Sequence, residues 1–546
     1  IIVWVVRQKQ NDSADYFLGG RDATWLAIGA SIFASNIGSE HLIGLAGAGA
    51  SSGMAMAHWE IQGWMILILG WVFVPFYTRS MVYTMPEFLE RRYNPQSRTI
   101  LSVISLVSYV LTKVAVTVYA GGLVFQQVFG IKELWGIDFF WIAAIGLVVL
   151  TALYTIFGGM KSVLYTSVLQ TPILLLGSLI ILVLGFKELG GWDEMMRVCG
   201  AVTVNDYGDT MTNLIRSNDD ANFPWLGALI GSAIIGFWYW CTDQFIVQRV
   251  LSGKNEMEAR RGTIFGAYLK LLPVFLFLIP GMIAFALHQK YIGAGGEGFL
   301  PMLANGTANA DAAFPTLVAK LLPAGVKGLV VCGILAALMS SLASLFNSSA
   351  MLFTIDFYKR FKPETPEKKL VGIGQIATIV IVVLGILWIP IMRSVGDVLY
   401  TYLQDVQSVL APGIAAAFLL GICWKRTSAQ GGMWGLIAGM IIGLTRLGAK
   451  VYYSNAGEVA DSTFKYLFYD MNWLFFCGWM FLFCIIVVIV VSLATEAPTA
   501  EKIQGLVFGT ATKEQKAATR ASWDHWDIIH TVIILAITGA FYWYFW

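Results

Sequence analysis

The sequence predicts an all-α integral membrane protein. Apolar runs of about 20 residues, the length of a helix that crosses a bilayer, recur along the whole chain. Hydrophobic residues make up 57% of the 546 residues and charged residues only 13%, a balance typical of membrane proteins. The lipid bilayer is therefore the expected environment, and a net charge of +2 gives no reason to expect a nucleic-acid partner.

The apolar runs predict thirteen complete membrane-spanning helices. They are expected near 24–48, 54–77, 99–130, 136–157, 161–187, 223–249, 262–288, 324–356, 370–394, 397–424, 430–452, 471–494 and 526–546. Residues 1–6 are interpreted as the remnant of another helix, which brings the expected total to about 14 spans in the intact protein. A polar loop at 188–222 and a charged linker at 495–523 separate groups of spans.

Basic residues predict which side of the membrane each loop faces. They recur in the loops at 7–21 and 78–98, between 249 and 261, between 359 and 369, and at 425–426. All of these loops fall on one side of the predicted bilayer, which is therefore expected to be cytoplasmic, together with the linker at 495–523. The loops at 188–222 and 453–470 are acidic or mixed in charge and are expected to be extracellular.

The span at 24–48 is expected to be broken at its centre. Five glycines punctuate residues 29–50, and the middle, Ser35-Asn36-Ile37-Gly38-Ser39-Glu40-His41, is polar. A charge in the middle of a bilayer costs roughly 2.5–3.5 kcal/mol even on insertion scales. Unpaired backbone groups at that depth must line a cavity, and a broken span is a good indicator of the binding site of a transporter. The alternative is a helix-packing face of small residues.

Other spans carry polar and aromatic side chains that suit a polyhydroxylated ligand. They are Glu60, Trp238, Tyr239, Trp240, Asp243, Lys270, Gln404 and Asp405. Hydroxyl groups need both donors and acceptors, and the faces of sugar rings stack on aromatic rings. The aromatic residues could instead form an interfacial belt or pack in the core, and Lys270 could extend to the cytoplasmic surface.

A stripe of serines marks the span at 324–356. Ser340, Ser341, Ser344 and Asn347 are spaced by three or four residues, so they share one helix face. Hydroxyl and carbonyl oxygens are ligands for small cations such as sodium, but serines also occur where helices pack closely.

The six cysteines form no close motif, so they predict neither a metal site nor a disulfide framework.

Together these motifs resemble the sodium/glucose cotransporters of the solute:sodium symporter family over nearly the full length. The resemblance rests on GASIFASNIGSEHLIGLAGAGASSG, YTMPEFLERRY, ALYTIFGG, WYWCTDQFIVQR, YLKLLP and LMSSLASLFNSSAMLFTIDFY. It implies a LeuT-like fold with two inverted five-helix repeats at 24–187 and 223–424. Two peripheral helices within 430–494 and a C-terminal helix at 526–546 would flank them.

The resemblance also implies the binding residues. A single sodium ion is expected at the carbonyls of Ala34, Ile37 and Ala337 and the hydroxyls of Ser340 and Ser341. The sugar is expected at Asn36, His41, Glu60, Tyr239, Trp240, Lys270 and Gln404. Leu45, Trp59 and Tyr400 fall at the outer gate of the family and Tyr239 at its inner gate.

Two positions depart from the family pattern. Gly236 stands where relatives have a polar residue that contacts the sugar, which leaves the identity of the sugar open. Ser167 stands where many relatives have an aspartate associated with a second sodium site. Without that carboxylate, one sodium ion per sugar is expected.

The expected function is inward sodium-coupled transport of a hexose, glucose or galactose, by alternating access. The protein is expected in the plasma (inner) membrane and to work as a monomer. Within the family, myo-inositol, another polyol, a sialic acid, an amino acid or an anion are alternative solutes. A membrane enzyme acting on sugars would need a catalytic pair, for which Glu60 and Asp243 are the only tempting partners. A sodium channel is disfavoured because no ring of charges or filter loop is recognisable.

Overall fold

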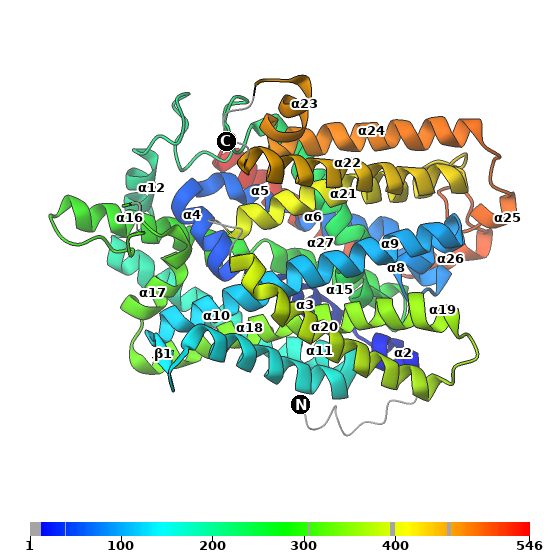
Figure 1. Cartoon of the computed structure of the whole chain (residues 1–546), viewed down its shortest axis with the longest axis horizontal. Helices are drawn as coiled ribbons and strands as arrows, with labels where there is room; N and C mark the ends of the chain where they lie inside the picture. The colour runs from blue at the N-terminus through cyan, green and yellow to red at the C-terminus, as the bar shows by residue number, and fades with distance from the viewer. Residues whose placement is uncertain (1–11, 39, 304–305, 394–398, 456–459) are drawn as a thin grey trace.

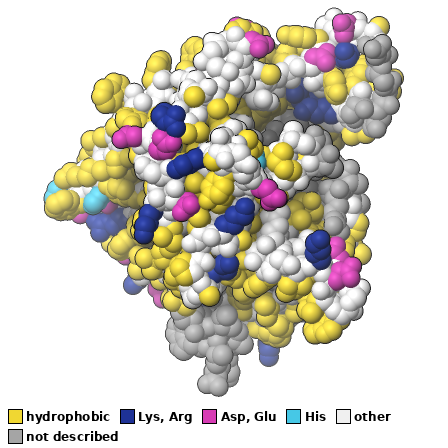
Figure 2. All heavy atoms as spheres, turned by 90° about the vertical axis from the view of Figure 1, so that its left-hand side faces the viewer, with side chains coloured by type: hydrophobic (Ala, Val, Ile, Leu, Met, Phe, Trp, Pro, Cys, Tyr) yellow, Lys and Arg dark blue, Asp and Glu magenta, His cyan; other side chains and the backbone are white. Residues whose placement is uncertain are grey.

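The computed structural model describes residues 12–38, 40–303, 306–393, 399–455 and 460–546, so the predicted remnant at 1–6 lies outside the described residues. The chain forms a bundle of long helices that run side by side along its longest axis (Figure 1). Helix α12, from the loop at 188–222, lies at one end of this axis, and α25 and α26, from the linker at 495–523, lie at the other. Figure 2 looks onto the first end and shows charged side chains of both signs among hydrophobic ones.

The first half of the chain contains the following elements, where η denotes a 3-10 or π-helix. They are α2 (Ser13–Leu18), η1 (Gly19–Arg21), α3 (Trp25–Asn36), η2 (Glu40–Leu45), α4 (Ala46–Ser52), η3 (Gly53–Met56), α5 (Ala57–Glu60), α6 (Gly63–Ile68), η4 (Leu69–Phe73), α7 (Val74–Ser80), α8 (Met85–Arg92), α9 (Pro95–Ser108), η5 (Tyr109–Val114), α10 (Ala115–Phe129), α11 (Phe139–Leu189) and α12 (Trp192–Gly200). A short antiparallel hairpin, β1 (Glu133–Leu134) and β2 (Ile137–Asp138), precedes α11 and pairs Glu133 with Asp138.

The second half continues the bundle. Its elements are α13 (Trp225–Gly236), η6 (Phe237–Thr242), α14 (Gln244–Leu251), α15 (Glu256–Lys270), η7 (Val274–Leu278), α16 (Ile279–Gly293), η8 (Ala310–Ala312), α17 (Ala313–Leu321), α18 (Ala324–Met351), η9 (Leu352–Tyr358), α19 (Lys359–Phe361), α20 (Glu367–Arg393), α21 (Leu399–Cys423), α22 (Ala429–Asn455), α23 (Thr463–Lys465), η10 (Tyr466–Asp470), α24 (Trp473–Ala494), α25 (Ala500–Ile503), α26 (Lys513–Ala521) and α27 (His525–Tyr544).

Within the described residues, ten helical stretches are long and apolar enough to cross a membrane. The count is lower than the thirteen predicted spans because two pairs of predicted spans are each counted as one stretch, within Glu40–Ser80 and Phe139–Leu189, and the span at 99–130 is not counted. Helix α11 comprises two helical stretches, corresponding to the predicted spans 136–157 and 161–187, that join without a loop at Gly159, whose φ of 52° is left-handed backbone that favours glycine. The first half of the broken span, Trp25–Asn36, and Ala115–Phe129 are apolar helices too short to be counted.

The predicted break at the centre of the first complete span is present. Helix α3 ends at Asn36, and Ile37 is extended with φ −82° and ψ 104° before η2 begins at Glu40. The glycines on either side of the break serve close packing. A Cβ at Gly29 would lie 2.5 Å from Phe265, and one at Gly49 would overlap the carbonyl oxygen of Leu278. This span therefore contains both a break and a close-packed face of small residues, and its role in binding stays a prediction.

A second break lies in the span that contains the aromatic cluster. The π-helix η6 ends at Thr242, and Asp243 is extended with φ −76° and ψ 127° before α14 begins. π-helical turns inside spans are frequent at functional sites because they redirect side chains. Helix α3 packs against α11, α15 and α18, so the first break is held inside the bundle.

Candidate functional site

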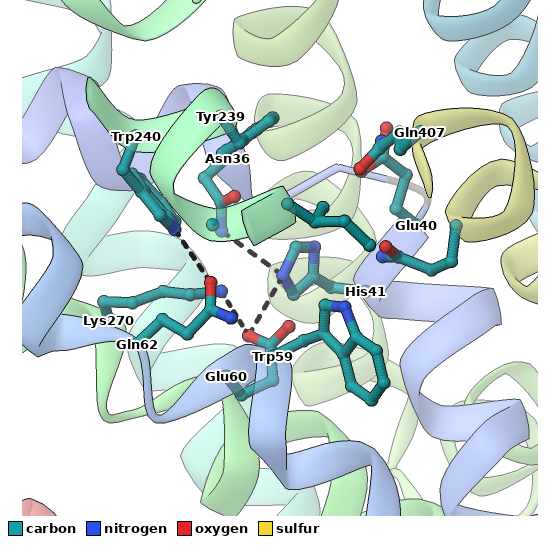
Figure 3. A pocket seen from close by; sticks show the side chains of 13 residues that line it. Asn36, Glu40, His41, Trp59, Glu60, Gln62, Tyr239, Trp240, Lys270 and Gln407 are labelled. Carbon is teal, nitrogen blue, oxygen red and sulfur yellow. Dashed lines mark hydrogen bonds and ion pairs between the residues drawn. The ribbon is translucent and has the colours of Figure 1, made fainter. Parts of the chain in front are cut away.

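A small cavity of about 40 Å³ lies where the helix breaks meet (Figure 3). It is lined by Asn36, Glu40, His41, Trp59, Glu60, Gln62, Ile235, Gly236, Tyr239, Trp240, Lys270, Gln404 and Gln407. All seven residues predicted to bind the sugar are among them. The structure therefore brings together side chains from five separate parts of the chain, and their role in binding stays a prediction.

Helix ends place most of these side chains. Asn36 is the last residue of α3, Glu60 the last of α5, and Lys270 the last of α15. His41 lies in the first turn of η2, just after the break. A helix that stops inside the bundle presents both its side chains and its unpaired backbone groups to the interior. These helices end around the cavity, and for that reason polar groups gather there.

An ion pair forms the core of the site. Lys270 Nζ lies 2.6 Å from Glu60 Oε2, and His41 Nε2 lies 3.2 Å from the same oxygen. The Asn36 amide nitrogen lies 3.3 Å from His41 Nε2. Glu60, Lys270 and His41 are at most 4% exposed. Because the Lys270 charge balances that of Glu60, this part of the cavity is close to neutral.

Several polar atoms around this core have no hydrogen-bond partner in the described part of the chain. They are His41 Nδ1, Trp59 Nε1 and Gln404 Oε1, all of them buried. Buried polar groups in native proteins are almost always paired, and leaving one unpaired costs about 1–3 kcal/mol. Unpaired donors and acceptors in one cavity indicate a site that completes its hydrogen bonds with a polar solute or water.

Of the six lining residues that were not predicted to bind the sugar, three carry an amide or carboxylate side chain: Gln62, Gln407 and Glu40. Gln62 follows Glu60 by two residues, Gln407 lies nearly one helical turn beyond Gln404, and Glu40 precedes His41. Figure 3 shows Glu40 and Gln407 on one side of His41, and Glu60 and Lys270 on the other. A polar residue in an apolar span was the available signal for both glutamines.

Aromatic residues cover the site on the side predicted to be extracellular. Trp59 stacks on Trp473 with ring centroids 5.5 Å apart and meets Phe223 edge to face at 6.0 Å. Leu45 is fully buried but does not line the cavity. The side chain of Tyr400, the third predicted outer-gate residue, lies outside the described residues. Trp473 and Phe223 belong to this cover and were not predicted.

A second buried ion pair lies on the predicted cytoplasmic side of the cavity. Lys113 Nζ is 2.6 Å from Asp243 Oδ2, and the hydroxyl of Tyr109 donates to Asp243 Oδ1. The same ammonium group lies 4.7 Å from the ring centroid of Tyr239, the predicted inner-gate residue. Lys113 and Asp243 are each 3% exposed. The pair connects η5 to the break before α14. Its ammonium group packs against the ring of Tyr239 on the predicted cytoplasmic side.

The two buried ion pairs bear on the alternative that the protein is a membrane enzyme acting on sugars. Glu60 is paired with Lys270, whereas Asp243 is paired with Lys113 and is not part of the cavity lining. A catalytic pair of carboxylates needs both groups to face one substrate. These two carboxylates do not share a cavity among the described residues.

The serine helix α18 packs directly against the first break. The Ser341 hydroxyl donates to the carbonyl of Ser35 at 3.1 Å, and the Ser35 and Ser344 hydroxyls are 2.7 Å apart. The last helical bond of α3 is from Ile37 N–H to the Phe33 carbonyl, so later carbonyls lie outside the helical pattern. The five residues predicted to bind sodium are all buried here: Ala34, Ile37, Ala337, Ser340 and Ser341. Their neutral oxygens suit a monovalent cation.

Ser167 contacts the predicted sodium site. Its hydroxyl lies 3.2 Å from that of Ser340 and donates to the Val163 carbonyl at 2.6 Å. An aspartate at position 167 would thus place a negative charge beside the serine stripe of α18, whereas Ser167 is uncharged.

Comparison with known proteins identifies the family. The model of the sodium:solute symporter family matches residues 16–439. The chain is 36% identical to the human (Homo sapiens) sodium/myo-inositol cotransporter 2 over 518 residues, which cover 92% of this chain and 76% of that protein. It is 37% identical to the sodium/myo-inositol cotransporter of Canis lupus familiaris over 525 residues, 92% of this chain and 72% of that one. These relatives carry myo-inositol in their names, not the glucose that the sequence resemblance implied.

A solved structure of a Na⁺-coupled sialic acid symporter in a substrate-bound outward-open state confirms the fold. It superimposes with a TM-score of 0.72 at 22% identity, over 91% of this chain and 95% of the other. The fold is therefore LeuT-like, as predicted, whereas the exact limits of the two repeats stay a prediction. Sodium is the coupling ion, in agreement with the family and these relatives. The chain belongs to the sodium:solute symporter family.

Proposed function

We propose that this protein couples inward sodium movement to the uptake of a neutral polyol, with myo-inositol as the first candidate and a hexose as the second. The names of the relatives favour the cyclitol. The predicted hexose, glucose or galactose, remains as the second candidate because His41 and Glu60 match the animal glucose carriers. The expected place of action is the plasma membrane, and the expected working unit is the monomer.

The observation that carries this proposal is a cavity whose described lining has one lysine, paired with Glu60, a further carboxylate, Glu40, and several unpaired polar atoms. Glu60 is neutralised by Lys270 at 2.6 Å, so an anionic solute would find no unpaired lysine or arginine among the described residues that line the cavity. His41 Nδ1, Trp59 Nε1 and Gln404 Oε1 supply both donor and acceptor capacity, which neutral hydroxyl groups need. The rings of Tyr239 and Trp240 add apolar faces for the C–H side of a six-membered ring.

The size of the cavity supports alternating access. A cavity needs about 10–15 Å³ to hold one water molecule. A volume of about 40 Å³ is therefore far too small for a six-membered ring with its hydroxyl groups. The aromatic cover around Trp59 on one side and Tyr239 on the other must separate in turn to admit and release the solute. Sodium between α3 and α18 is expected to favour the arrangement that opens outward, through a difference in its affinity for the two states.

One sodium ion supplies enough free energy for strong accumulation. Its charge crossing 100 mV contributes about 2.3 kcal/mol. A tenfold sodium gradient adds roughly 1.4 kcal/mol. Together these terms support accumulation of a neutral solute by several-hundred-fold at a ratio of one to one.

Binding to the purified protein tests the identity of the solute. Radiolabelled myo-inositol is expected to bind in sodium and not in choline, with competition by unlabelled myo-inositol stronger than by glucose or galactose. Sialic acid serves as the anionic control and is not expected to compete. Stronger competition by glucose or galactose would make the hexose the solute, and competition by sialic acid alone would overturn the neutral-polyol proposal.

Replacing Ser341 by Ala is expected to raise the sodium concentration for half-maximal uptake by about tenfold, since one of five proposed ligands is lost. The fold should be retained because the hydroxyl makes a single bond, to the Ser35 carbonyl. The measurement is sodium activation of uptake at a fixed solute concentration, with Ser349→Ala, also buried on α18, as the matched control. Unchanged sodium activation would remove Ser341 from the site.

Introducing Asp at Ser167 is expected to raise the number of sodium ions carried per solute. The carboxylate would lie beside the hydroxyl of Ser340 and would add the charge that the serine lacks. The ratio is measured from the reversal potential of solute-coupled current, with Ser167→Asn as the uncharged control. A ratio equal to that of the wild type in Ser167→Asp would show that this position does not set the stoichiometry.

A further inference from the structure

Gly236 and Gln62 occupy one space at the edge of the cavity. A Cβ built on Gly236 would lie 2.5 Å from Gln62 Oε1, 2.9 Å from its Cδ and 3.1 Å from its Nε2. Real Cβ contacts are essentially never shorter than 3.0 Å. Any side chain at position 236 would therefore displace the amide of Gln62. The polar group that the resemblance implies at position 236 is replaced here by one that comes from the turn between α5 and α6.

Hydrogen bonds hold the Gln62 amide in this space. Its Nε2 donates to the Ser232 carbonyl at 2.8 Å, and its Oε1 accepts from Trp240 Nε1 at 3.3 Å. Gln62 is 3% exposed. A primary amide offers two donor hydrogens and two acceptor lone pairs. One donor and one acceptor remain, which can serve one hydroxyl group in both directions or two neighbouring hydroxyl groups.

The same bond also fixes the orientation of Trp240. The indole nitrogen is held by Gln62, and the Lys270 ammonium lies 5.3 Å from the indole ring centroid (Figure 3). Lys270 is in turn paired with Glu60. Gln62 thus bonds to Trp240 and lies next to the Glu60–Lys270 pair. Moving its amide would change the orientation of the Trp240 ring and the polar groups that face the solute.

The alternative is that Gly236 is a packing glycine of α13. Gly227 and Gly231 of this helix have that role, since their added Cβ atoms would meet Leu474 on α24 at 3.1 and 2.9 Å. Gly236 differs from them because its three nearest atoms all belong to one polar side chain that lines the cavity. Only Gly236 therefore affects the solute site directly.

We propose that Gln62, admitted by Gly236, is a specificity-determining residue that reads the hydroxyl pattern of the polyol. The inference rests on the proposed function and names the part of the site that selects among neutral ring polyols. Gly236 acts through Gln62: it provides the space, and the amide makes the contact. The pair is expected to discriminate between stereoisomers that differ in the orientation of one hydroxyl group, such as myo- and scyllo-inositol.

A double-mutant cycle tests this inference. The variants are Gly236→Ala, Gln62→Ala and the combination of both, with Gly231→Ala as the matched control on the same helix. Sodium-driven uptake into proteoliposomes is measured for myo-inositol, scyllo-inositol, glucose and galactose at equal reconstituted protein. Gly236→Ala adds only a methyl group against the end of a flexible side chain, so the fold is expected to survive.

Gly236→Ala and Gln62→Ala are each expected to raise the KM for myo-inositol by about tenfold, the effect of one lost buried hydrogen bond, with a smaller change in maximal rate. Each should also alter the ratio of KM values for the two inositols. In the Gln62→Ala background, Gly236→Ala should have no further effect, because the clash is gone. Gly231→Ala should keep the wild-type ratio.

Two other outcomes are distinguishable. If the wild type transports a polyol but the two substitutions are additive and leave the order of stereoisomers unchanged, the inference fails and the proposed function stands. If the wild type shows no sodium-driven uptake of any of the four solutes, the proposed function fails and the inference falls with it.

Discussion

Replacing Glu60 by Gln is expected to reduce sodium-driven solute uptake by a hundredfold or more. The substitution leaves the Lys270 ammonium buried without its partner at 2.6 Å. Removing one member of a buried ion pair costs about 3–5 kcal/mol. It also replaces the carboxylate that lies 3.2 Å from His41 Nε2 with a neutral amide. Uptake by reconstituted protein and thermal unfolding in detergent measure the two consequences separately.

A neutral pair separates stability from function. Glu60→Gln combined with Lys270→Met removes both charges and is expected to recover most of the lost thermal stability but none of the uptake. The matched control is Glu194→Gln, which breaks the exposed pair with Arg197 at 2.7 Å. Exposed pairs contribute about 0–1 kcal/mol, so this variant should behave as the wild type. Wild-type uptake by the neutral pair would remove Glu60 and Lys270 from the solute site.

Replacing Asp243 by Asn is expected to weaken the closure of the site on its cytoplasmic side. Lys113 would lose its carboxylate partner at 2.6 Å while remaining buried against the ring of Tyr239. An uncompensated buried charge draws in water or moves to find a partner, and either response displaces the inner-gate ring. We expect uptake to fall at least about tenfold, and sodium to leak without solute, because about 1.4 kcal/mol of lost closure is a tenfold change in the open population.

The leak is the specific readout for this second prediction. Sodium entry into proteoliposomes is measured without solute, for the wild type, Asp243→Asn and the double variant with Lys113→Met. The double variant removes the stranded charge and is expected to leak less than Asp243→Asn alone. A structural defect elsewhere would not be relieved by Lys113→Met. Wild-type uptake and tightness in Asp243→Asn would show that the pair does not hold the inner gate.

The membrane class, the first helix break and seven of the residues that line the candidate site could be predicted from the sequence. The polar centre at Asn36 to His41 could not continue a helix in lipid, and the structure breaks there. All seven predicted sugar residues line one cavity because motif resemblance transfers positions in a shared fold. The sequence motifs did not distinguish glucose from myo-inositol, because neutral ring polyols need similar hydrogen-bond donors and acceptors.

The missed residues depend on contacts between distant segments. The amide of Gln62, in the turn between α5 and α6, has its place in the cavity only because residue 236, at the end of α13, has no side chain. Neither the glycine at 236 nor the glutamine at 62, taken alone, indicates that the two share one space. Lys113 is a charged residue within the predicted span at 99–130, and a charge at that depth implies a partner. Its partner Asp243 was noted, but the pairing across 130 positions could not be read from spacing.

The boundaries of spans were the other limit. The predicted spans 136–157 and 161–187 match two helical stretches of α11 (Phe139–Leu189), which meet at the non-helical Gly159 without a polar loop between them. Hydropathy locates apolar length, whereas continuity depends on whether one residue can adopt a special backbone geometry. A left-handed glycine can redirect a helix without the polar loop that a sequence scan looks for.

The most direct measurement is the uptake of radiolabelled myo-inositol into proteoliposomes that contain the purified protein, with and without an inward sodium gradient. Sodium-coupled polyol transport predicts accumulation above the external concentration only with the gradient, and its collapse on adding a sodium ionophore. Glucose and galactose are run in parallel to rank the solutes. Uptake that merely equilibrates, or is equal with and without sodium, would contradict the account.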